Sequence, residues 1–379
     1  MHKSIRKISQ LLPGLTLCLV VMAASLYIAK WLGVVINYFQ GILDGGSSPI
    51  SSIFVAIIMG ILIRNVIGLH DDFQKGVNFS VKIVLKAGII LLGIRLSFLD
   101  VITLGAWGIP IILICVITGL FVTIWITAKL NQSHRLGTLT AVGTGICGVT
   151  AIVGTAPGIK ANKEEITYSI GSITIFGIIA MFLYPYLAHW FFSDDPVRAG
   201  LFLGTAIHET AQVAGASLIY NQIFQSNEVV DVATISKLTR NTLLIAVVPL
   251  MSYYYLKTSN RSSTDGQERK KWYQLIPLFV IGFLLMAIVR TIGDSGVQEY
   301  QLAFGILSPD QWQMVWESLN TFGSEYLLGI AMAAVGLSTN LRMFKTLGVR
   351  PFYIGMVAAL TVTGISLLMV YLLGGFIAY

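Results

Sequence analysis

The sequence predicts an all-α polytopic membrane protein built from two inverted repeats, with glycine-rich helices that are broken or re-entrant at mid-membrane. Three observations predict this fold. Apolar residues make up 55% of the 379 positions and charged residues only 11%, whereas soluble proteins carry about 25% charged residues. Apolar runs long enough to span a bilayer recur along the chain. Two polar, glycine-rich segments that resemble each other interrupt these runs.

Nine apolar runs are candidate spans, and no segment has the composition of an appended soluble domain. We therefore expect residues 1–379 to form one transmembrane domain with about nine full spans plus two re-entrant hairpins, or 11 spans. The first run follows MHKSIRK and resembles a signal peptide, but its length of about 20 residues favours an uncleaved first helix. The candidate spans are residues 11–31, 50–69, 80–98, 109–127, 166–190, 233–255, 272–289, 323–336 with flanks, and 352–376.

The positive charge of the chain lies mainly in short connections between the apolar runs. This is the pattern of cytoplasmic loops, and no basic stretch alternates with aromatic residues, so we expect no nucleic-acid partner despite the net charge of +7. The most basic connection, residues 257–271, should be cytoplasmic, as should the N-terminus. Loops with acidic bias, around Asp44, Glu228 and Asp294, should face outward.

The two glycine-rich segments are copies of one element. Residues 143–157 read GTGICGVTAIVGTAP and residues 204–217 read GTAIHETAQVAGAS. With one gap, the copies share glycine, threonine and isoleucine near their starts and a Thr-Ala pair further on. Inside a bilayer, glycine-broken backbone is tolerated only where it is buried in protein or lines a watery cavity. Two such breaks in corresponding positions are the best sequence pointer to a transporter's binding site.

The charges around these segments favour re-entrant hairpins. Suppose that each segment enters the membrane and returns to the same side. Lys160 and Lys163 then lie on the cytoplasmic side and Asp194 and Asp195 on the outer side, and the two copies enter the membrane from opposite faces. Full crossing by discontinuous helices stays open as the alternative.

A second, weaker repeat supports inversion. Residues 94–110 read IRLSFLDVITLGAWGIP and residues 335–351 read VGLSTNLRMFKTLGVRP, and both lie between two apolar runs. By the loop charges, the first copy leads outward and the second inward. The repeat-like units would cover about residues 80–192 and 198–376.

Hydroxyl groups and unwound amides at helix N-termini form a cradle for an anion, because exposed N–H groups and the helix dipole both favour negative charge. The alternative is close helix packing through small residues, which explains less well why threonines accompany the glycines in both copies. The predicted substrate-binding residues are Gly143, Thr144, Gly145, Cys147, Gly148, Thr150, Gly204, Thr205, His208, Thr210, Gln212 and Asn241.

Ionisable residues within membrane spans are costly and are usually functional. His208 and Glu209 could carry a coupling proton; alternatively, Glu209 forms a structural pair with a nearby cation while His208 bonds a carbonyl. Lys237, Arg240 and Asn241 share one helical face. Lys237 could neutralise Glu209 or contact an anionic substrate, or the stripe could lie near the membrane boundary with its long chains reaching the headgroups. A second cation candidate is Lys86.

Two apparent enzyme motifs lack their required context. GTGICG matches the dinucleotide fingerprint but lies among membrane spans rather than between a strand and a helix. HETAQ lacks the second histidine of a zinc protease helix. The three cysteines, Cys18, Cys115 and Cys147, are scattered and mostly within apolar runs. We therefore expect no cofactor, no metal and no disulfide framework.

Three segments together resemble a known family. TAPGIKANKEE, GTAIHETAQVAGAS and VATISKLTRNTLL are similar to the YeiH-type family of proposed sulfate exporters of the bacterial inner membrane. The similarity covers most of the chain, and HETAQVAGA is its specific part. The resemblance implies the fold of the bile-acid, arginine and citrate transporter superfamily, with inverted repeats and a core domain that moves against a scaffold. By the same analogy a homodimer is possible, and the substrate would be sulfate or an organosulfonate.

The preferred expectation is a secondary active transporter of a small anion, an exporter that works by alternating access with an ion gradient, for which we favour the proton. The sequence contains no P-loop, which favours an ion gradient or exchange as the driving force. A sodium-coupled organic-anion importer and a passive anion channel stay open within transport. From another class, a membrane-embedded enzyme stays open, although no constellation beyond His208 and Glu209 supports it, so we expect that the protein is not an enzyme.

Overall fold

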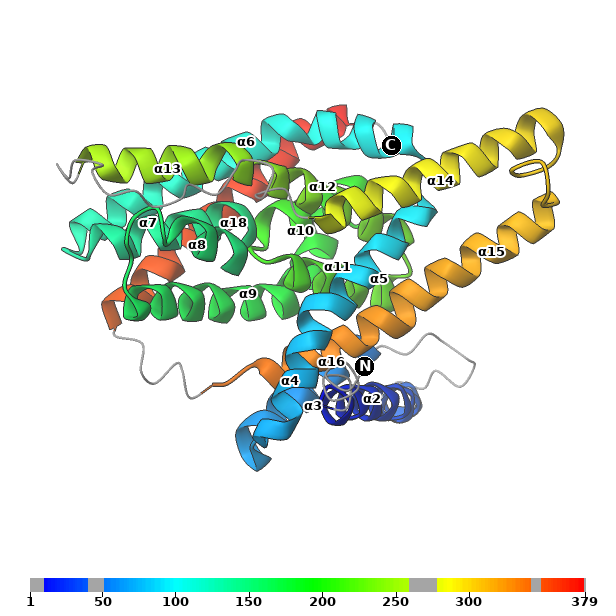
Figure 1. The fold of residues 1–379 in the computed structure, drawn as a ribbon, viewed down its shortest axis with the longest axis horizontal. Helices are drawn as coiled ribbons and strands as arrows, with labels where there is room; N and C mark the ends of the chain where they lie inside the picture. Colours follow the sequence, from blue (N-terminus) through cyan, green and yellow to red (C-terminus); the bar gives the residue numbers. More distant parts are fainter. Residues whose placement is uncertain (1–9, 40–50, 259–277, 342–348, 378–379) are drawn as a thin grey trace, which may run out of the picture. The chain divides into compact units, whose positions relative to one another are not determined.

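The protein is described here by a computed structural model, drawn in Figure 1, which covers residues 10–39, 51–258, 278–341 and 349–377. In this part of the chain the elements are helices, and the only β-structure is an isolated bridge between Ala303 and Leu307. Seven helices are long and apolar enough to cross a membrane: Leu12–Val35, Asp71–Arg95, Phe98–Lys129, Glu164–Phe192, Leu278–Tyr300, Pro309–Ser338 and Val349–Phe376. The predictions of an all-helical fold and of a multi-pass membrane protein are confirmed.

The chain divides into two compact units. Unit 1 comprises Met1–Ile102, Leu218–Asn227 and Leu278–Leu341, and unit 2 comprises Thr103–Ser217, Glu228–Pro277 and Arg342–Tyr379. The copies of the weaker repeat, residues 94–110 and 335–351, each contain a boundary between the units; residues 342–348 of the second copy lie outside the described residues. Repeats are defined by internal similarity and units by packing, so the repeat-like units at 80–192 and 198–376 stay a prediction.

Unit 1 is a set of closely packed helices. They are α2 (Leu12–Phe39), α3 (Ser52–Leu62) continued by η1 (Ile63–Ile67), the span α4–η2–α5–η3 (Asp71–Phe79, Ser80–Val84, Leu85–Leu92, Gly93–Arg95), α14 (Leu278–Tyr300), and the span α15–η6–α16 (Pro309–Thr321, Phe322–Leu327, Leu328–Ser338). Glycines allow the backbones to touch: a Cβ atom on Gly336 would lie 2.3 Å from the carbonyl oxygen of Ile57, and one on Gly76 would lie 2.3 Å from that of Leu11.

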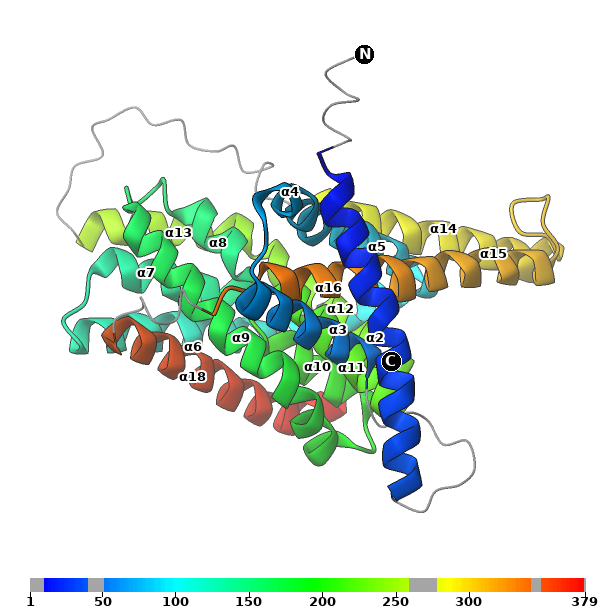
Figure 2. The ribbon, with the colours of Figure 1, turned by 90° about the horizontal axis from the view of Figure 1, so that it is seen from below.

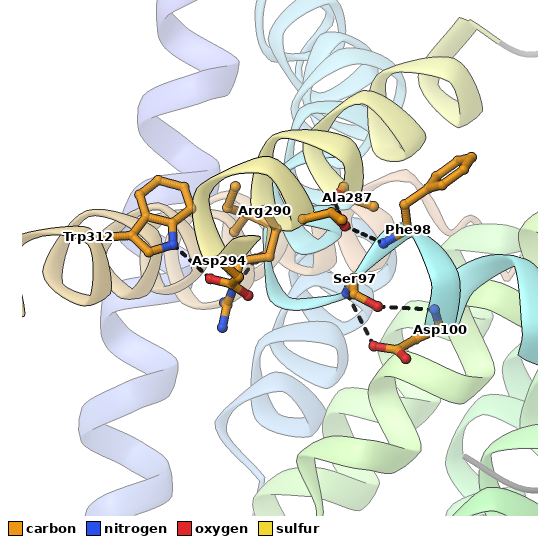
Figure 3. A network of polar contacts seen from close by, with 9 residues as sticks. Ser97, Phe98, Asp100, Ala287, Arg290, Asp294 and Trp312 are labelled. Atoms are coloured by element: carbon orange, nitrogen blue, oxygen red, sulfur yellow. Dashed lines mark hydrogen bonds and ion pairs between the residues drawn. The ribbon is translucent and has the colours of Figure 1, made fainter. Parts of the chain in front are cut away.

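A polar network joins α14 to α15 in unit 1 (Figure 3). The Asp294 carboxylate accepts one hydrogen bond from Arg290 Nε at 2.6 Å and another from Trp312 Nε1 at 2.8 Å. The Arg290 guanidinium also stacks 3.8 Å from the ring centre of Trp316. The prediction of a loop at Asp294 is therefore wrong: α14 continues to Tyr300, past the predicted end at residue 289, and the carboxylate bonds within the helix pair. That this region faces outward stays a prediction.

Unit 2 contains the glycine-rich segments. Its elements are α6 (Phe98–Lys129, from Thr103), α7 (His134–Val142) with the π-helical turn η4 (Gly143–Cys147), α8 (Val149–Thr155), α9 (Lys163–Phe192), α10 (Pro196–Ala206), α11 (Thr210–Phe224, to Ser217), α12 (Asn227–Thr242, from Glu228), α13 (Leu244–Thr258), α18 (Val349–Leu373) and η7 (Gly374–Phe376). Local signals set the helix starts: a capping box between Asn162 and Glu165 begins α9, and Asp195 caps α10 before Pro196. Helix α18 packs alongside α9 (Figure 2).

Most of the predicted spans correspond to single long helices, and two do not. The predicted span 50–69 is the shorter apolar helix Ser52–Ile67. The predicted span 233–255 is wrong as a single helix, because α12 ends at Thr242 and α13 begins at Leu244. At this joint Leu243 N–H bonds the Arg240 carbonyl three residues back, so the backbone tightens locally. The acidic loop at Asp44 and the basic connection 257–271, apart from its first two residues, lie outside the described residues.

Candidate functional site

The first glycine-rich segment folds back on itself within unit 2. Helix α7 and η4 lead to Gly148, whose φ of 68° and ψ of −126° reverse the chain into α8, and α7 and α8 pack against each other (Figure 1). Ser133, just before α7, donates a hydrogen bond to Glu165 in the first turn of α9 at 2.5 Å. Residues 134–155, called hairpin 1, therefore begin and end at the same end of unit 2.

The second segment also folds back. Helix α10 runs parallel to α12, since a Cβ atom on Gly200 would touch Val232 and one on Gly204 would touch Ser236. Residues 207–209 interrupt the helix, and α11 then begins at Thr210, whose hydroxyl accepts from Asn241 near the end of α12 at 3.1 Å. Near the other end of α11, Asn221 donates to Asn227, the first residue of α12, at 2.9 Å, so α11 runs opposite to α12 and to α10. We call residues 196–217 hairpin 2.

The two hairpins enter unit 2 from opposite ends. Helix α9 connects them: it begins beside the ends of hairpin 1 and finishes at Phe192, three residues before the Asp195 cap of α10. Its 30 residues extend about 45 Å. Glu228, in the first turn of α12 rather than in a loop, is close enough to Asp195 for the two charges to interact. The end of unit 2 that bears hairpin 2 carries Asp194, Asp195 and Glu228 beside one cation, Arg198, which pairs with Asp195. The end that bears hairpin 1 carries Arg135, Lys160 and Lys163 beside Glu164 and Glu165.

The breaks of the two hairpins meet inside unit 2. A Cβ atom built on Gly148 would lie 3.2 Å from Cβ of Glu209, so the turn of hairpin 1 touches the interrupted backbone of hairpin 2. We call this region the crossing. It consists of the turn at Gly148, the interrupted residues 207–209 and the polar side chains of α12 beside them. Two features require glycine at position 148: the positive φ of the turn and the close approach of Glu209.

Two cations of α12 bond the open backbone of both hairpins. The Lys237 ammonium donates to three carbonyl oxygens, those of Ile146 at 3.0 Å, Ile207 at 2.9 Å and His208 at 2.5 Å. Arg240, one turn further on, donates to the carbonyl oxygens of Gly145 at 2.8 Å, Thr205 at 2.6 Å, Ile207 at 3.4 Å and Thr144 at 2.5 Å. Six carbonyl groups from two segments distant in sequence are thereby held together.

These bonds satisfy groups that would otherwise be costly. The last carbonyls of a helix have no partner within it and carry the negative end of its dipole, and nothing in a bilayer interior replaces that partner. The side chains of Lys237 and Arg240 are 1% and 0% exposed, so the alternative in which they reach the headgroups is wrong. Among the ion pairs of the described ranges, none joins either cation to a carboxylate; the partners are carbonyls.

The other predicted binding residues differ in whether their polar atoms are already bonded. The Thr205 hydroxyl donates to the Leu201 carbonyl at 2.6 Å and bonds the Ser366 hydroxyl of α18 at 2.7 Å. Gly143 and Gly204 pack closely, against Ile173 and Ser236, as the helix-packing alternative expects. Thr144, Gly145 and Cys147 are buried in η4, and Thr150, in the first turn of α8, is exposed.

The buried polar atoms of hairpin 2 and α12 that have no hydrogen-bond partner within the described part of the protein include Oγ of Ser236 and Nε of Arg198, which is ion-paired with Asp195 at 3.0 Å, and three further atoms lie beside the crossing. These three are Nδ1 of His208, Oε1 of Gln212 and Oδ1 of Asn241, on side chains that are 1–2% exposed. Buried polar groups are normally bonded, so these atoms are available to a ligand or a water molecule. The Gln212 amide nitrogen donates to the Thr174 carbonyl at 3.4 Å, which orients that side chain.

Glu209 is half-buried at the crossing and does not pair with His208 in the described contacts. The imidazole of His208 lies instead within bonding reach of the Thr144 backbone. Lys86 is not part of the crossing: it is an exposed residue of unit 1, with its ammonium 5.8 Å from the ring centre of Phe279.

Sequence reasoning missed the contribution of α18. Its Ser366 bonds Thr205, and its Thr363 bonds the Tyr184 hydroxyl of α9 at 2.5 Å. The available signal was the spacing: Thr363 and Ser366 lie three residues apart and so share one face of an otherwise apolar helix.

Comparison with known proteins places the chain among membrane proteins. A family model described as "Conserved hypothetical protein 698" matches residues 13–355. A UPF0324 membrane protein of Bacillus anthracis is 32% identical over 327 residues, 84% of this chain and 86% of the relative. Another, of Streptococcus pyogenes, is 30% identical over 364 residues, 96% of this chain and 97% of the relative. A third, of Fusobacterium nucleatum, is 29% identical over 331 residues, 86% of this chain and 91% of the relative.

Proposed function

The chain belongs to the family described as conserved hypothetical protein 698, and we propose that it is a secondary active transporter of a small anion. The observation that carries the proposal is the meeting of two oppositely directed, broken hairpins inside unit 2. Transporters place their sites at such breaks, between inverted elements, because unwound backbone at membrane depth is stable only where it is buried or lines a cavity. Hairpins that enter from opposite ends are also what inverted repeats would produce.

The charges at the crossing favour an anion. Lys237 and Arg240 contribute two positive charges and Glu209 one negative charge, so the formal balance of these three groups is positive. The carbonyl ends of the broken helices, which would attract a cation, are already bonded. Helix α11, 15 residues long, begins beside the crossing with the positive end of its dipole. The similarity of the GTAIHETAQVAGAS segment to the YeiH-type exporters narrows the proposed substrate to sulfate or an organosulfonate.

The proposed orientation follows from the charges at the two ends of unit 2. The end with Arg135 and Lys160 would face the cytoplasm, and the end with Asp194, Asp195 and Glu228 would face outward. Each glycine-rich segment is then a re-entrant hairpin that reaches mid-membrane from its own side. The N-terminus would be cytoplasmic, in a bacterial inner membrane, and transport would proceed by alternating access with a proton carried by Glu209 or His208.

Thermal stabilisation of the purified protein tests the proposal. A ligand that binds only the native state raises its apparent stability by mass action. The panel contains sulfate, thiosulfate, sulfite, sulfoacetate, taurine and a bile acid at two pH values, each with and without sodium, against chloride at equal ionic strength. We expect a sulfur oxyanion or sulfonate to raise the Tm in a pH-dependent, sodium-independent way. A shift that requires sodium and the bile acid would instead indicate an organic-anion importer, and no shift with any anion would contradict the proposal.

A pair of matched threonine variants locates the binding. Thr210→Val removes a hydroxyl at the crossing, and loss of one hydrogen bond to a charged ligand costs about 1.5–3 kcal/mol, or roughly 10- to 100-fold in Kd. Thr127→Val is the control, because in the described part of the protein the Thr127 hydroxyl donates to the Thr123 carbonyl of its own helix. Equal Kd values for the two variants would show that the crossing only packs.

A further inference from the structure

Lys237 is bonded as a bound monovalent cation would be: its direct partners are carbonyl oxygens, and no carboxylate of the described residues forms an ion pair with it, although Glu209 is close enough for the two charges to interact. Its three donors point at three carbonyl oxygens, from η4 and from the break between α10 and α11, at 2.5–3.0 Å. Only the protonated amine has three N–H groups to donate. Unwound carbonyls and half-helix C-terminal ends are the groups that bind the coupling Na⁺ in broken-helix transporters.

Arg240 completes the arrangement. It lies one turn from Lys237 and bonds four carbonyl oxygens of the same two segments. One of them, that of Ile207, accepts from both cations. The carbonyl-lined position is therefore filled by groups attached covalently to α12, and a free metal cation placed there would meet two fixed positive charges.

We infer that the Lys237 ammonium is a resident cation, that is, a covalently attached positive group that takes the place of a coupling Na⁺ at the crossing. Anion binding and transport then need no sodium, and truncation of the Lys237 side chain uncovers a latent monovalent-cation site. This inference rests on the proposed function only for its statement about transport. The statement about the cation concerns the stability of the crossing and stands separately.

The arrangement of the two hairpins therefore does not depend on the binding of a free cation. In a sodium-coupled transporter the ion assembles the broken segments when it binds, so their arrangement depends on the sodium concentration. Here the same carbonyls are bonded by side chains that never leave. Any coupling must then act through other groups of the crossing, of which Glu209 is the ionisable carboxylate.

Thermal unfolding without any substrate anion tests the inference. Wild type and Lys237→Ala are measured in chloride salts of sodium, potassium, n-propylammonium and choline at constant ionic strength. The n-propylammonium ion is the fragment that truncation of lysine to alanine removes, and choline is too large to enter. Lys237→Met is the companion variant, because its side chain refills the space of the lysine stem but leaves the carbonyls unpaired. Lys86→Ala is the matched control, since it removes an exposed lysine of unit 1.

We expect the wild-type Tm to be the same in sodium and in choline. The Tm of Lys237→Ala falls and recovers saturably, by about 3 °C or more, with n-propylammonium. The Tm of Lys237→Met falls without that recovery, and Lys86→Ala behaves as wild type. A saturable sodium shift in the wild type would overturn the inference even if no Lys237 variant could be purified. Failure of all three small cations to restore Lys237→Ala would overturn it as well.

The outcomes are separable from those of the anion panel. Rescue of Lys237→Ala with no anion shift in the wild type would retain the resident cation and reject anion transport. An anion shift that also requires sodium would retain transport and reject the resident cation.

Discussion

Gly148 is the residue on which the turn of hairpin 1 depends. Its backbone angles are ones that residues with a Cβ atom rarely adopt, and its Cβ position faces Glu209 at 3.2 Å. We expect Gly148→Ala to cost about 1–3 kcal/mol and to lower the Tm of the purified protein. The control is Gly154→Ala within α8, where the nearest atom to a new Cβ is Val248 Cγ2 at 3.9 Å and alanine favours the helix. If Gly154→Ala is as damaging as Gly148→Ala, the turn is not the cause.

Glu209 is the residue on which proton coupling would depend. It is half-buried at the crossing, and no described ion pair contains it. We therefore expect Glu209→Gln to leave assembly intact and to abolish transport or remove its pH dependence, measured as flux into proteoliposomes across a pH series. Glu164→Gln, at an exposed position in the first turn of α9, serves as the control. Wild-type flux with an unchanged pH profile in Glu209→Gln would exclude the carboxylate as the proton carrier.

At the scale of elements, the hairpins and α9 define two ends of unit 2. Single cysteines at Lys160 and Asp194, both exposed, report on these ends once the buried Cys18, Cys115 and Cys147 are replaced by alanine. We expect an impermeant maleimide to label position 160 from the cytoplasmic side and position 194 from the other side. Labelling of position 160 from the periplasmic side and of position 194 from the cytoplasmic side would mean that the first glycine-rich element crosses the membrane fully.

Helix α12 differs from the other long elements because its interior carries the polar side chains of the site. It ends where those side chains meet the two breaks, and α13 continues after the tightened backbone at Leu243. The predicted span at residues 233–255 failed for this reason. Hydropathy averages the apolar residues of α13 with the polar face of α12, and it carries no information about the joint between them.

At the scale of the whole molecule, unit 1 has polar contacts of its own, whereas the crossing belongs to unit 2. Asp294 accepts from Arg290 and Trp312, and its removal leaves a partly buried guanidinium without its carboxylate. We expect Asp294→Asn to lower the Tm, at a cost of about 1–3 kcal/mol, while the Kd for the substrate anion stays unchanged. Glu317→Gln is the control, because Glu317 is exposed and, among the described residues, accepts a hydrogen bond from Gln313 in the neighbouring turn of its own helix. A changed anion Kd in Asp294→Asn would show that the units are coupled at equilibrium.

The sequence by itself determined the class of fold, most of the spans and the places where helices are interrupted. These follow from local rules: a bilayer requires a fixed length of apolar residues and a backbone that bonds within its own segment, and glycine marks the exceptions. Gly148, with its positive φ, and the interrupted residues 207–209 lie in the two segments that composition singled out. The loop charges also predicted that the two segments point in opposite directions.

Only the tertiary structure decided what the polar residues do. Lys237 and Arg240 bond carbonyls that lie 29–96 residues away in sequence, the Thr205 hydroxyl is taken by Ser366, 161 residues away, and Lys86 lies in the other unit. A buried donor or acceptor must find a partner, but the sequence does not say which one. The partner depends on how α12, the hairpins and α18 pack, and that packing is a property of the folded chain rather than of any segment of it.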